Sequence, residues 1–490
     1  MGMQTQLRPR IIEANRNQHI LRPTDIEQLV DDEHPVRAIW DFVGRMDLSR
    51  FYASIASVDG EAGRSAWDPK LMISIWIYAY SRGISSAREI ERRFEFDPAF
   101  QWLTGMEVIN HHSLSDFRVS GKATLDELFQ QALGLLSADG LITMERVMHD
   151  ETKIRANASG DTFRREERIR EFLRLAGTQI EAMDDPRKED TSRREEKARE
   201  RAIRERKEKL ELALEELEKI RKSKSGKEAK DQARASVTDP EARVMKQSNG
   251  GFAPSYNAQI STDSVHGIVV GASITQNGSD YNELIPALDT IEKNTGRLPS
   301  QVVVDGGFTS RENIIGVADK KVDLIGSVDQ GNSQSLGQMK RRGVAEDFYP
   351  NKFEYHSKNN TYCCPAGKIL NHKGQEKSAG VVRQIYQADD KDCLGCAFKH
   401  LCCPGAKHGR SLVKGVDDPI VTAFKAKMET DEAKKIYKQR GPIAEFSNAW
   451  IKTKIGLRQF SVRGFRKVSL ELSGACLALN IQQWTRCRAV

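Results

Sequence analysis

Three carboxylates in three different settings are the residues of this chain best suited to binding divalent metal ions. Asp150 ends the short run Val147–Asp150, Asp305 ends the apolar run Gln301–Asp305, and Glu445 lies in a stretch with helical character. Hard carboxylate oxygens suit Mg²⁺ or Mn²⁺ and leave positions open for phosphate oxygens. Two such ions about 4 Å apart can activate a water or a hydroxyl and stabilise the oxygen that leaves a phosphodiester. If two strands and one helix bring these side chains together, the sequence predicts metal-assisted phosphoryl transfer.

The spacing around Glu445 supports its selection for this role. The pattern is Tyr437-x2-Arg440-x4-Glu445-x6-Lys452. Seven residues make about two helical turns, so Glu445 and Lys452 would share one helix face. That face would carry a metal ligand and a cation suited to a phosphate. The simpler alternatives are a strand-end cap for Asp150, a turn residue for Asp305 and a surface residue for Glu445.

Glu151 follows Asp150 directly, so two carboxylates are adjacent in the sequence at the first candidate metal ligand. Neighbouring side chains of a strand point to opposite faces. Glu151 should therefore point away from Asp150, unless the strand ends there. The two glycines after Asp305 would let backbone and ligand approach closely.

A cysteine cluster is the second candidate metal site. Six of the eight cysteines lie between Cys363 and Cys403. Clustering in a chain that is otherwise poor in cysteine favours metal binding over disulfides. Four thiolates would make a tetrahedral structural zinc site, and the spacing of Cys393 and Cys396 is its specific part. The expected ligands are Cys364, Cys393, Cys396 and Cys402, with Cys363, Cys403, His400 and His408 as substitutes. A thiol-rich loop without metal is the alternative, and Cys476 and Cys487 are expected to be packed helix residues.

The elements that must position these residues form a mixed α/β pattern. Residues 1–135 are expected to be helical, either as a helix-turn-helix-like module or as a plain bundle. Strands are expected at 141–158, 256–262, 268–274, 301–305 and 322–325, with helices at 282–294 and 311–320. This order predicts a mixed sheet flanked by helices.

Residues 161–230 differ sharply in composition, because 22 are Lys or Arg and 19 are Asp or Glu. Ile203, Leu210 and Leu217 repeat every seven residues, which predicts a short helical seam in one arm of a hairpin. The net charge of only +3 favours a solvated helical face over a dedicated nucleic-acid clamp. Ser223–Gly226 suggests a flexible tip near that point.

Length and composition set broad limits. The 490 residues suggest about three domains, and a net charge of +7 suits an anionic partner without proving one. The first residues lack an apolar segment typical of a secretory signal, and no apolar run approaches 18 residues. A soluble, cytoplasmic protein is therefore expected.

Several sequence blocks, in order, resemble the DDE-type bacterial insertion-sequence transposases. Residues 147–158, residues 302–308 and the Tyr437 to Lys452 pattern resemble the three catalytic blocks of that family, and further similarity lies at 85–92 and 460–464. The resemblance implies an RNase H-like mixed sheet flanked by helices, an N-terminal all-α domain and two insertions. The implied boundaries are a DNA-binding domain at 1–135, a catalytic core at 141–330 and 411–485, a charged helical insertion at 161–245 and a cysteine-rich insertion at 331–410.

The resemblance also implies roles for single residues. Glu445 is preferred over Glu429, Glu432 and Glu471 because it matches the family's spacing. Asp150, Asp305 and Glu445 would be catalytic and would hold Mg²⁺ or Mn²⁺, with zinc at the cysteines. The DNA-binding residues would be Tyr437, Arg440, Lys452, Arg458, Arg463, Arg88 and Arg92.

The implied partners are DNA, as element ends and as target, and a second copy of the chain. The implied location is the bacterial cytoplasm, at the nucleoid, with no membrane partner. Two alternatives stay open: a nuclease on the same fold that lacks strand transfer, and a catalytically silent DNA-binding protein derived from a transposase.

Overall fold

The structure is a computed structural model, and it describes residues 23–55, 57, 65–120, 122–183, 193–327, 332–378, 381–415 and 418–488. The predicted absence of a secretory signal concerns residues outside these ranges. No helix within the described ranges is both long and apolar enough to cross a lipid bilayer.

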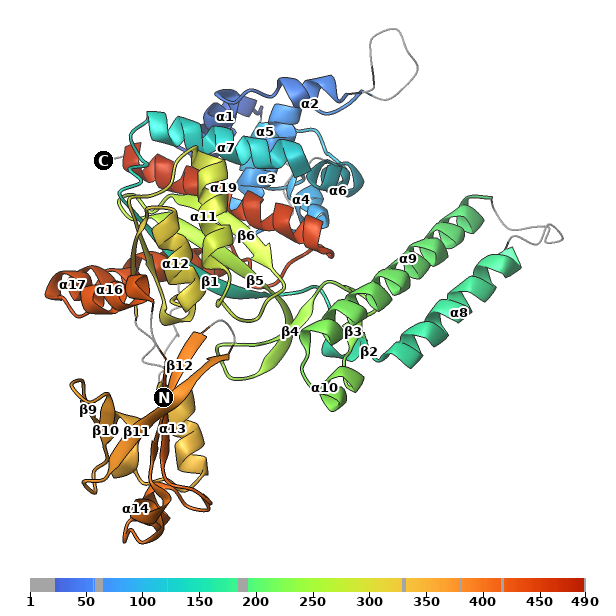
Figure 1. Cartoon of the computed structure of the whole chain (residues 1–490). Coiled ribbons are helices and arrows are strands. Elements are labelled where there is room, and N and C mark those ends of the chain that lie inside the picture. The colour runs from blue at the N-terminus through green and yellow to red at the C-terminus, as the bar shows by residue number, and fades with distance from the viewer. Residues whose placement is uncertain are drawn as a thin grey trace, which may run out of the picture.

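A six-stranded mixed sheet forms the centre of the molecule (Figure 1). Its strands are β1 (Arg146–Arg155), β4 (Arg243–Lys246), β5 (Phe252–Asp263), β6 (Val269–Thr275), β7 (Gln301–Val304) and β8 (Asp323–Gly326). Their order is β4-β5-β1-β7-β8, and β6 pairs with the same edge of β5 as β4 does. The β5 strand runs antiparallel to β1, whereas β1, β7 and β8 are parallel. This is the predicted RNase H-like sheet.

Helices cover both faces of this sheet. On one face, α11 (Leu284–Thr295) packs with Ile291 close to Ser261 of β5, and α12 (Arg311–Asp319) lies beside α11. On the other face, α18 (Phe446–Thr453) is tied to β5 by a hydrogen bond between Ser447 and Thr262. The long helix α19 (Phe465–Arg488) packs against β6 and α18.

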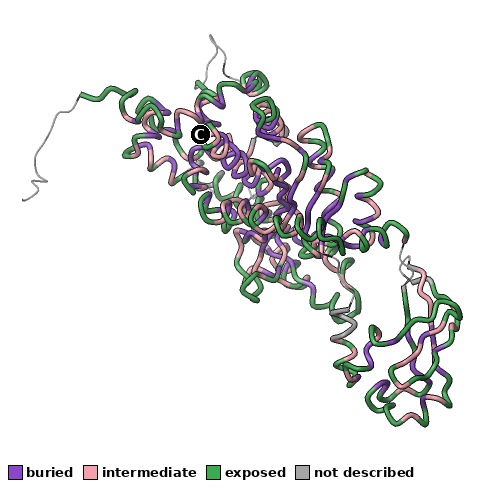
Figure 2. The backbone as a smooth tube through the Cα atoms, turned by 90° about the vertical axis from the view of Figure 1, so that its left-hand side faces the viewer, coloured by how far each residue is buried: buried purple, intermediate pink, exposed green. Residues whose placement is uncertain are grey.

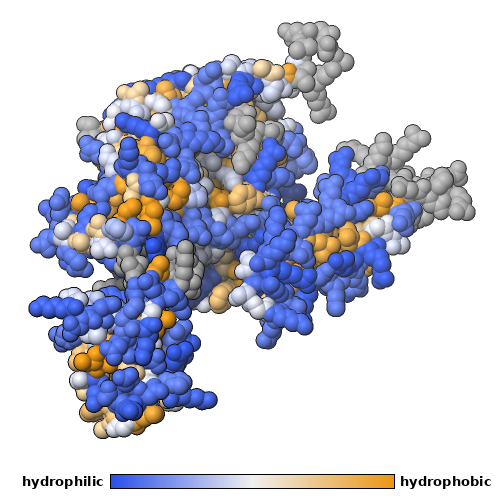
Figure 3. All heavy atoms as spheres, viewed as in Figure 1, coloured by the Kyte–Doolittle hydropathy of each residue, from blue (hydrophilic) through white to orange (hydrophobic). Residues whose placement is uncertain are grey.

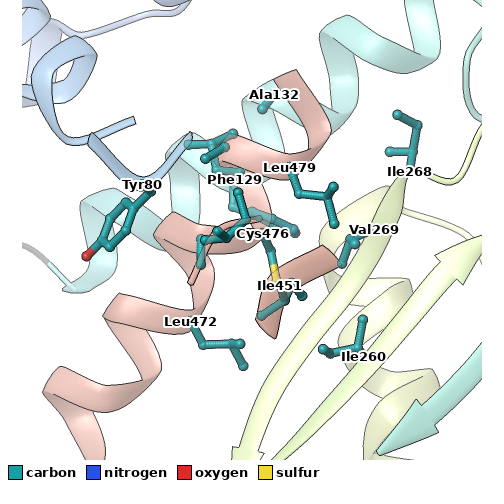
Figure 4. Packing of buried hydrophobic residues seen from close by; sticks show 14 of the residues in the cluster. Tyr80, Phe129, Ala132, Ile260, Ile268, Val269, Ile451, Leu472, Cys476 and Leu479 are labelled. Carbon is teal, nitrogen blue, oxygen red and sulfur yellow. The ribbon is translucent and has the colours of Figure 1, made fainter. Parts of the chain in front are cut away.

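The N-terminal helices share the core of the sheet domain. They are α1 (Pro35–Gly44), α2 (Ser49–Ala53), α3 (Pro69–Ser81), α4 (Ala87–Arg93), α5 (Pro98–Thr104), α6 (His111–Ser120) and α7 (Lys122–Ala138). The side chain of Ser86 caps α4 by accepting a hydrogen bond from the backbone N–H of Glu89. Helix α19 contacts α1, α3, α6 and α7, and one continuous apolar cluster runs from these helices into the sheet. Figure 4 shows Cys476 of α19 within this core, which confirms its predicted packing role.

The charged segment forms a projecting helical arm, as predicted (Figure 1). It consists of α8 (Glu166–Met183) and α9 (Arg193–Ser223), with β2 (Phe163–Arg164), β3 (Ala235–Ser236) and α10 (Lys227–Asp231) at its root. Leu210, Ala213 and Leu217 form the buried seam. The predicted tip at Ser223–Gly226 was wrong, because α9 ends at Ser223 beside the root. The predicted end of the insertion at 245 also needs correction, since β4 from Arg243 pairs with the central sheet.

The cysteine-rich insertion is a separate small unit with its own apolar cluster. Its five-stranded sheet has the order β13-β12-β11-β10-β9. The strands are β9 (Glu354–His356), β10 (Thr361–Cys363), β11 (Ile369–Ser378), β12 (Val381–Ala388) and β13 (Ser411–Gly415), with helices α13 (Asn332–Arg341), α14 (Asp390–Leu394) and α15 (Lys399–Cys402). Because β13 pairs with β12, the insertion extends to Gly415 and does not end at 410 as predicted.

Two short helices, α16 (Pro419–Met428) and α17 (Asp431–Lys438), lead back from this unit to the core. Burial follows this division: Figure 2 shows buried backbone concentrated in the central sheet and in the helices around it. Hydrophilic side chains dominate the visible face of the arm and of the cysteine-rich unit (Figure 3).

Candidate active site

Strand register brings Asp150 and Asp305 to the same level on neighbouring strands. The parallel pairing of β1 and β7 joins Val147 to Val302 and Met148 to Val303. Continued for two residues beyond the last pair, this register would set Asp150 level with Asp305. Asp305 follows the last residue of β7, as predicted. Asp150 lies within β1, which continues to Arg155, so it falls inside the strand expected at 141–158 and is not a strand-end cap.

A single guanidinium group lies close to both aspartates. Arg440 Nη1 lies 3.6 Å from Asp150 Oδ1, and Arg440 Nη2 lies 4.0 Å from Asp305 Oδ1. The hydroxyl of Tyr437 donates a hydrogen bond of 3.3 Å to Asp305 Oδ1. The arrangement concentrates negative charge at one point and neutralises it with a side-chain cation.

Burial dominates the electrostatics of Asp150. Loss of solvent raises the pKa of this carboxyl above its usual range, and nearby Asp305 acts in the same direction. Arg440 and Asn448 act in the opposite direction, since Asn448 Nδ2 donates a hydrogen bond of 3.0 Å to Asp150 Oδ2. Sequence reasoning missed Asn448, although its spacing of three residues from Glu445 predicts a shared helix face.

Glu445 ends a π-helical turn, Gly441–Glu445, that contacts both β1 and β5. In an α-helix, five residues turn the chain by about 500°, which would leave Arg440 and Glu445 about 140° apart. The wider π turn reduces this angle, and such turns occur frequently at functional sites. The Glu445 carboxylate itself is exposed, and it makes no hydrogen bond or ion pair to either aspartate in the described part of the chain. The structure thus unites two of the three predicted carboxylates and holds the third nearby on the adjoining helix.

Glu151 points to the opposite face of β1, as predicted. Its carboxylate pairs with Lys153 Nζ at 3.2 Å, two residues along the same face. Burial, and then the proximity of Asp280, raises the pKa of Glu151. Glu151 therefore shares its face of β1 with Lys153 and lies close to Asp280.

No three His, Cys, Asp or Glu side chains among the described residues stand together in an arrangement that could hold a metal ion. The chemistry of the two aspartates nevertheless fits a divalent cation, because a guanidinium already lies near both. A third oxygen ligand would require the exposed Glu445 side chain to turn toward them.

Comparison with known protein families gives two matches along the chain. A model described as "Transposase domain (DUF772)" matches residues 24–120, and one described as "Transposase DDE domain" matches residues 363–485. The chain belongs to the DDE-type insertion-sequence transposases. Nothing among curated proteins matches the chain.

The matched segments cover only part of this transposase's site. Tyr437, Arg440, Glu445 and the cysteine cluster lie within residues 363–485, whereas Asp150 and Asp305 lie outside both segments. Strand register and the Arg440 contacts therefore link the two aspartates to the family's C-terminal segment.

The predicted DNA-binding residues of the transposase fall into two regions. Lys452 lies on α18, where burial lowers the pKa of its ammonium while Glu151 acts against this. Arg458 is exposed, and its backbone oxygen accepts a hydrogen bond of 3.1 Å from Arg155 N, so this segment runs along the end of β1. Arg463 is exposed nearby and donates to Asn157 O at 2.9 Å. Tyr437 and Arg440 contact the aspartates, whereas Arg458 and Arg463 lie along the segment at and beyond the end of β1.

Arg88 and Arg92 lie on α4 of the N-terminal helices. Both are exposed, and Arg92 pairs with Glu89 at 2.7 Å. Arg118, on α6, points inward, since it donates to Ser85 O at 2.7 Å and lies over the Trp76 ring. An exposed cationic face thus remains on α4 but not at Arg118.

Five of the eight cysteines of the transposase line one small cavity of about 20 Å³. Its cysteines are Cys364, Cys393, Cys396, Cys402 and Cys403. Two of the sulfurs accept backbone hydrogen bonds: Cys364 Sγ from Lys368 N at 3.2 Å, and Cys393 Sγ from Arg410 N at 3.3 Å. Burial raises the pKa of the Cys402 thiol to about 12. Of the predicted substitutes, His408 pairs with Asp390 at 3.1 Å.

Proposed function

We propose that this transposase cuts the ends of its insertion sequence and joins the freed 3′-hydroxyl to target DNA. Asp150 and Asp305 would hold divalent Mg²⁺ or Mn²⁺ ions, and Glu445 would complete the ligand set. The observation that carries the proposal is the Arg440 guanidinium within 4.0 Å of both aspartates, because it marks a point where two carboxylates require a cation. When bound, the ions would polarise the scissile phosphate and lower the pKa of the attacking water or hydroxyl.

The reaction consists of two displacements at phosphorus. In the first, a water oxygen attacks the phosphorus at the element end, the P–O3′ bond breaks, and a 3′-hydroxyl and a 5′-phosphate result. In the second, that 3′-hydroxyl attacks a target phosphodiester, a new P–O bond forms, and a target 3′-hydroxyl leaves. No covalent bond to the protein is required.

The roles proposed for the surrounding residues follow from their positions. Asn448 orients Asp150. Lys452, which lies on the same helix as Asn448 and is partly buried, would offer its cation to a DNA phosphate. Arg440 would turn from the aspartates toward DNA phosphate when metal binds, with Tyr437 beside it. The exposed Arg458 and Arg463 would contact the sugar-phosphate backbone of the bound DNA strand. Arg88 and Arg92 would contact the DNA from α4.

The test is cleavage of a labelled duplex that carries the element's own end, in Mg²⁺ or Mn²⁺. Cleavage by wild type should be abolished in Asp150→Ala, Asp305→Ala and Glu445→Ala. Asp323→Ala is a matched control. This exposed carboxylate begins β8, whereas Asp305 follows the end of the parallel strand β7, and it pairs with Lys427. Equal cleavage by the site variants would refute the assignment. Binding without cleavage would favour the silent binder, and cleavage without joining would favour the nuclease.

We also propose that the cysteine-rich unit binds one structural zinc ion through Cys364, Cys393, Cys396 and Cys402. The two backbone N–H groups that point at Cys364 and Cys393 sulfur support this, since such donors stabilise thiolates. The thiols would draw together around the cavity they already line.

Assembly of two copies of the chain on paired DNA ends is a further part of the proposal, with the nucleoid as the place of action. Sedimentation of the protein with one end duplex and with two would test it. A complex of one chain with one duplex under all conditions would refute it.

A further inference from the structure

We propose that a basic groove at the root of the helical arm binds the phosphate backbone of duplex DNA that leads away from the active site. This inference rests on the proposed function for its ligand, DNA, and not on the cleavage chemistry. The groove is a cavity of about 740 Å³ between the end of α9, β4 and the segment after β6.

The lining of this groove is cationic. It includes Lys219, Lys224, Arg234 and Arg243, and no Asp or Glu is among the described residues that line it. Gln276 and Asn277 add polar groups, and Gly278 allows close approach of a ligand to the backbone. Cations, amides and an accessible backbone are the groups that contact phosphate and sugar in protein–DNA interfaces.

A buried carboxylate orients one wall of the groove. Glu216 is 2% exposed and accepts hydrogen bonds from Lys219 at 2.6 Å and from Arg243. Burial opposes ionisation of Glu216, but these two cations hold its pKa below the usual range. Glu216 therefore fixes Lys219 and Arg243 in place and neutralises one of the four charges.

The opposite situation holds for Lys224 and Arg234. Neither forms an ion pair with another described residue, and Arg234 is exposed. Two uncompensated cations in one concave surface attract an anionic polymer more strongly than scattered charges do.

The rest of the arm does not share this charge pattern. Several of its cations pair with carboxylates along the helices, including Arg170 with Glu166 and Arg204 with Glu200. Residues 161–230 carry a net charge of only +3, whereas the described residues that line the groove include four cations and no carboxylate.

The groove is connected to the active site through one loop. Asn277 lines the groove, and its backbone oxygen accepts a hydrogen bond of 3.1 Å from Asn257 Nδ2. The same Asn257 amide reaches Asp280 Oδ1 at 3.3 Å. A Cβ atom placed on Gly307 would lie 3.3 Å from Asp280 Oδ2, and Gly307 is two residues from Asp305. This loop therefore joins the groove to the segment that follows Asp305.

The test compares two charge-reversed double variants of the full chain, each changing the net charge equally. Lys224→Glu with Arg234→Glu alters the groove, whereas Arg201→Glu with Lys209→Glu alters exposed cations on the outer part of α9. The equilibrium affinity for an end duplex is measured without divalent metal over a series of salt concentrations. The slope of log K against log salt should fall by about 2 for the groove variant, since each lost phosphate contact removes about 0.9. The arm variant should change neither slope nor affinity by a comparable amount.

Equal weakening by both variants, or no weakening by the groove variant, would overturn the proposal. Lys224→Arg with Arg234→Lys should retain binding and controls for local folding, as does an unchanged melting temperature. The cleavage assay separates the two proposals: a wild type that binds through the groove but never cleaves refutes only the catalytic one. A wild type that does not bind the duplex at all refutes both.

Discussion

Asn448 donates one hydrogen bond of 3.0 Å to Asp150 Oδ2, and the same amide nitrogen lies 3.3 Å from the backbone oxygen of Glu151. Its Oδ1 atom is buried and has no hydrogen-bond partner within the described residues. Helix α18 therefore fixes the orientation of a carboxylate on β1, in a segment almost 300 residues away in sequence. Asn448 is a positioning residue, because it acts on the reaction through Asp150.

Replacement of Asn448 should weaken metal binding and shift its pH dependence. Without the donated hydrogen bond, the pKa of Asp150, already raised by burial, rises further, and protons compete with metal up to a higher pH. For Asn448→Ala we expect Mn²⁺ affinity near pH 7 to fall about 10-fold, as is typical when a partner of a metal ligand is lost. Electron paramagnetic resonance of free Mn²⁺ across a pH series would measure both effects. If Mn²⁺ affinity at low pH falls off at the same pH in Asn448→Ala as in wild type, the hydrogen bond does not set the pKa of Asp150.

Removal of the Arg440 cation should have the opposite effect on metal binding. Arg440→Ala leaves two carboxylates without their neutralising group, so the metal no longer competes with a guanidinium within 4.0 Å of both aspartates. We expect Mn²⁺ to bind roughly tenfold more tightly, since charges at this separation interact strongly near a protein surface. Arg440→Lys, which keeps a positive charge, and Arg458→Ala, which removes an exposed one, serve as controls. Affinity that stays at the wild-type value in Arg440→Ala would argue against competition.

DNA cleavage by Arg440→Ala should nevertheless fall, because the proposed phosphate contact is lost with the same side chain. A variant that binds metal more tightly and cleaves faster would contradict the proposed double role of Arg440.

Glu471 should make the stability of the fold depend on pH. This carboxylate of α19 is fully buried and accepts hydrogen bonds from Ser461 N, Ser461 Oγ and Val462 N. Burial raises the pKa of Glu471. The folded state then binds the proton more tightly than the unfolded state. Stability is therefore lost as pH rises from the ordinary carboxyl range through the raised value.

Glu471→Gln lacks this titration and so provides the reference. We expect the unfolding free energy of wild type to fall relative to Glu471→Gln as pH rises from about 4.5. The slope of that difference should be at most about 1.4 kcal/mol per pH unit. Urea unfolding of both proteins from pH 5 to pH 9 would measure the difference. A difference that does not vary with pH would show that Glu471 titrates alike in both states.

Zinc removal should destabilise the cysteine-rich unit. Purified transposase should contain about one zinc per chain, and Cys393→Ser or Cys396→Ser should lose it, since four thiolates complete a structural site. A strong chelator should lower the melting temperature of wild type but not of these variants. Cys487→Ser should retain zinc, because that cysteine lies at the end of α19. Wild type free of zinc after purification in zinc-containing medium would refute the site.

The sequence alone determined the elements and the residue types at the site. Period-2 and helical patterns predicted the central strands and the helices around them, because apolar spacing reflects which face of an element is buried. The alternation of side chains along β1 also predicted that Glu151 would face away from Asp150. Resemblance within short blocks predicted which aspartates and which glutamate matter.

Only the tertiary structure decided how those residues meet. The register of β1 against β7 sets Asp150 level with Asp305, and strand pairing over long distances is not encoded in either strand by itself. The π turn that carries Glu445 and the inward orientation of Asn448 depend on packing against β1 and β5. The basic groove likewise forms only where α9 ends beside β4. Its cations come from separate segments of the chain, and the local preferences of one segment carry no information about its contact with another. Local patterns record local preferences, whereas a site is made of contacts between distant segments, and the folded chain alone specifies those contacts.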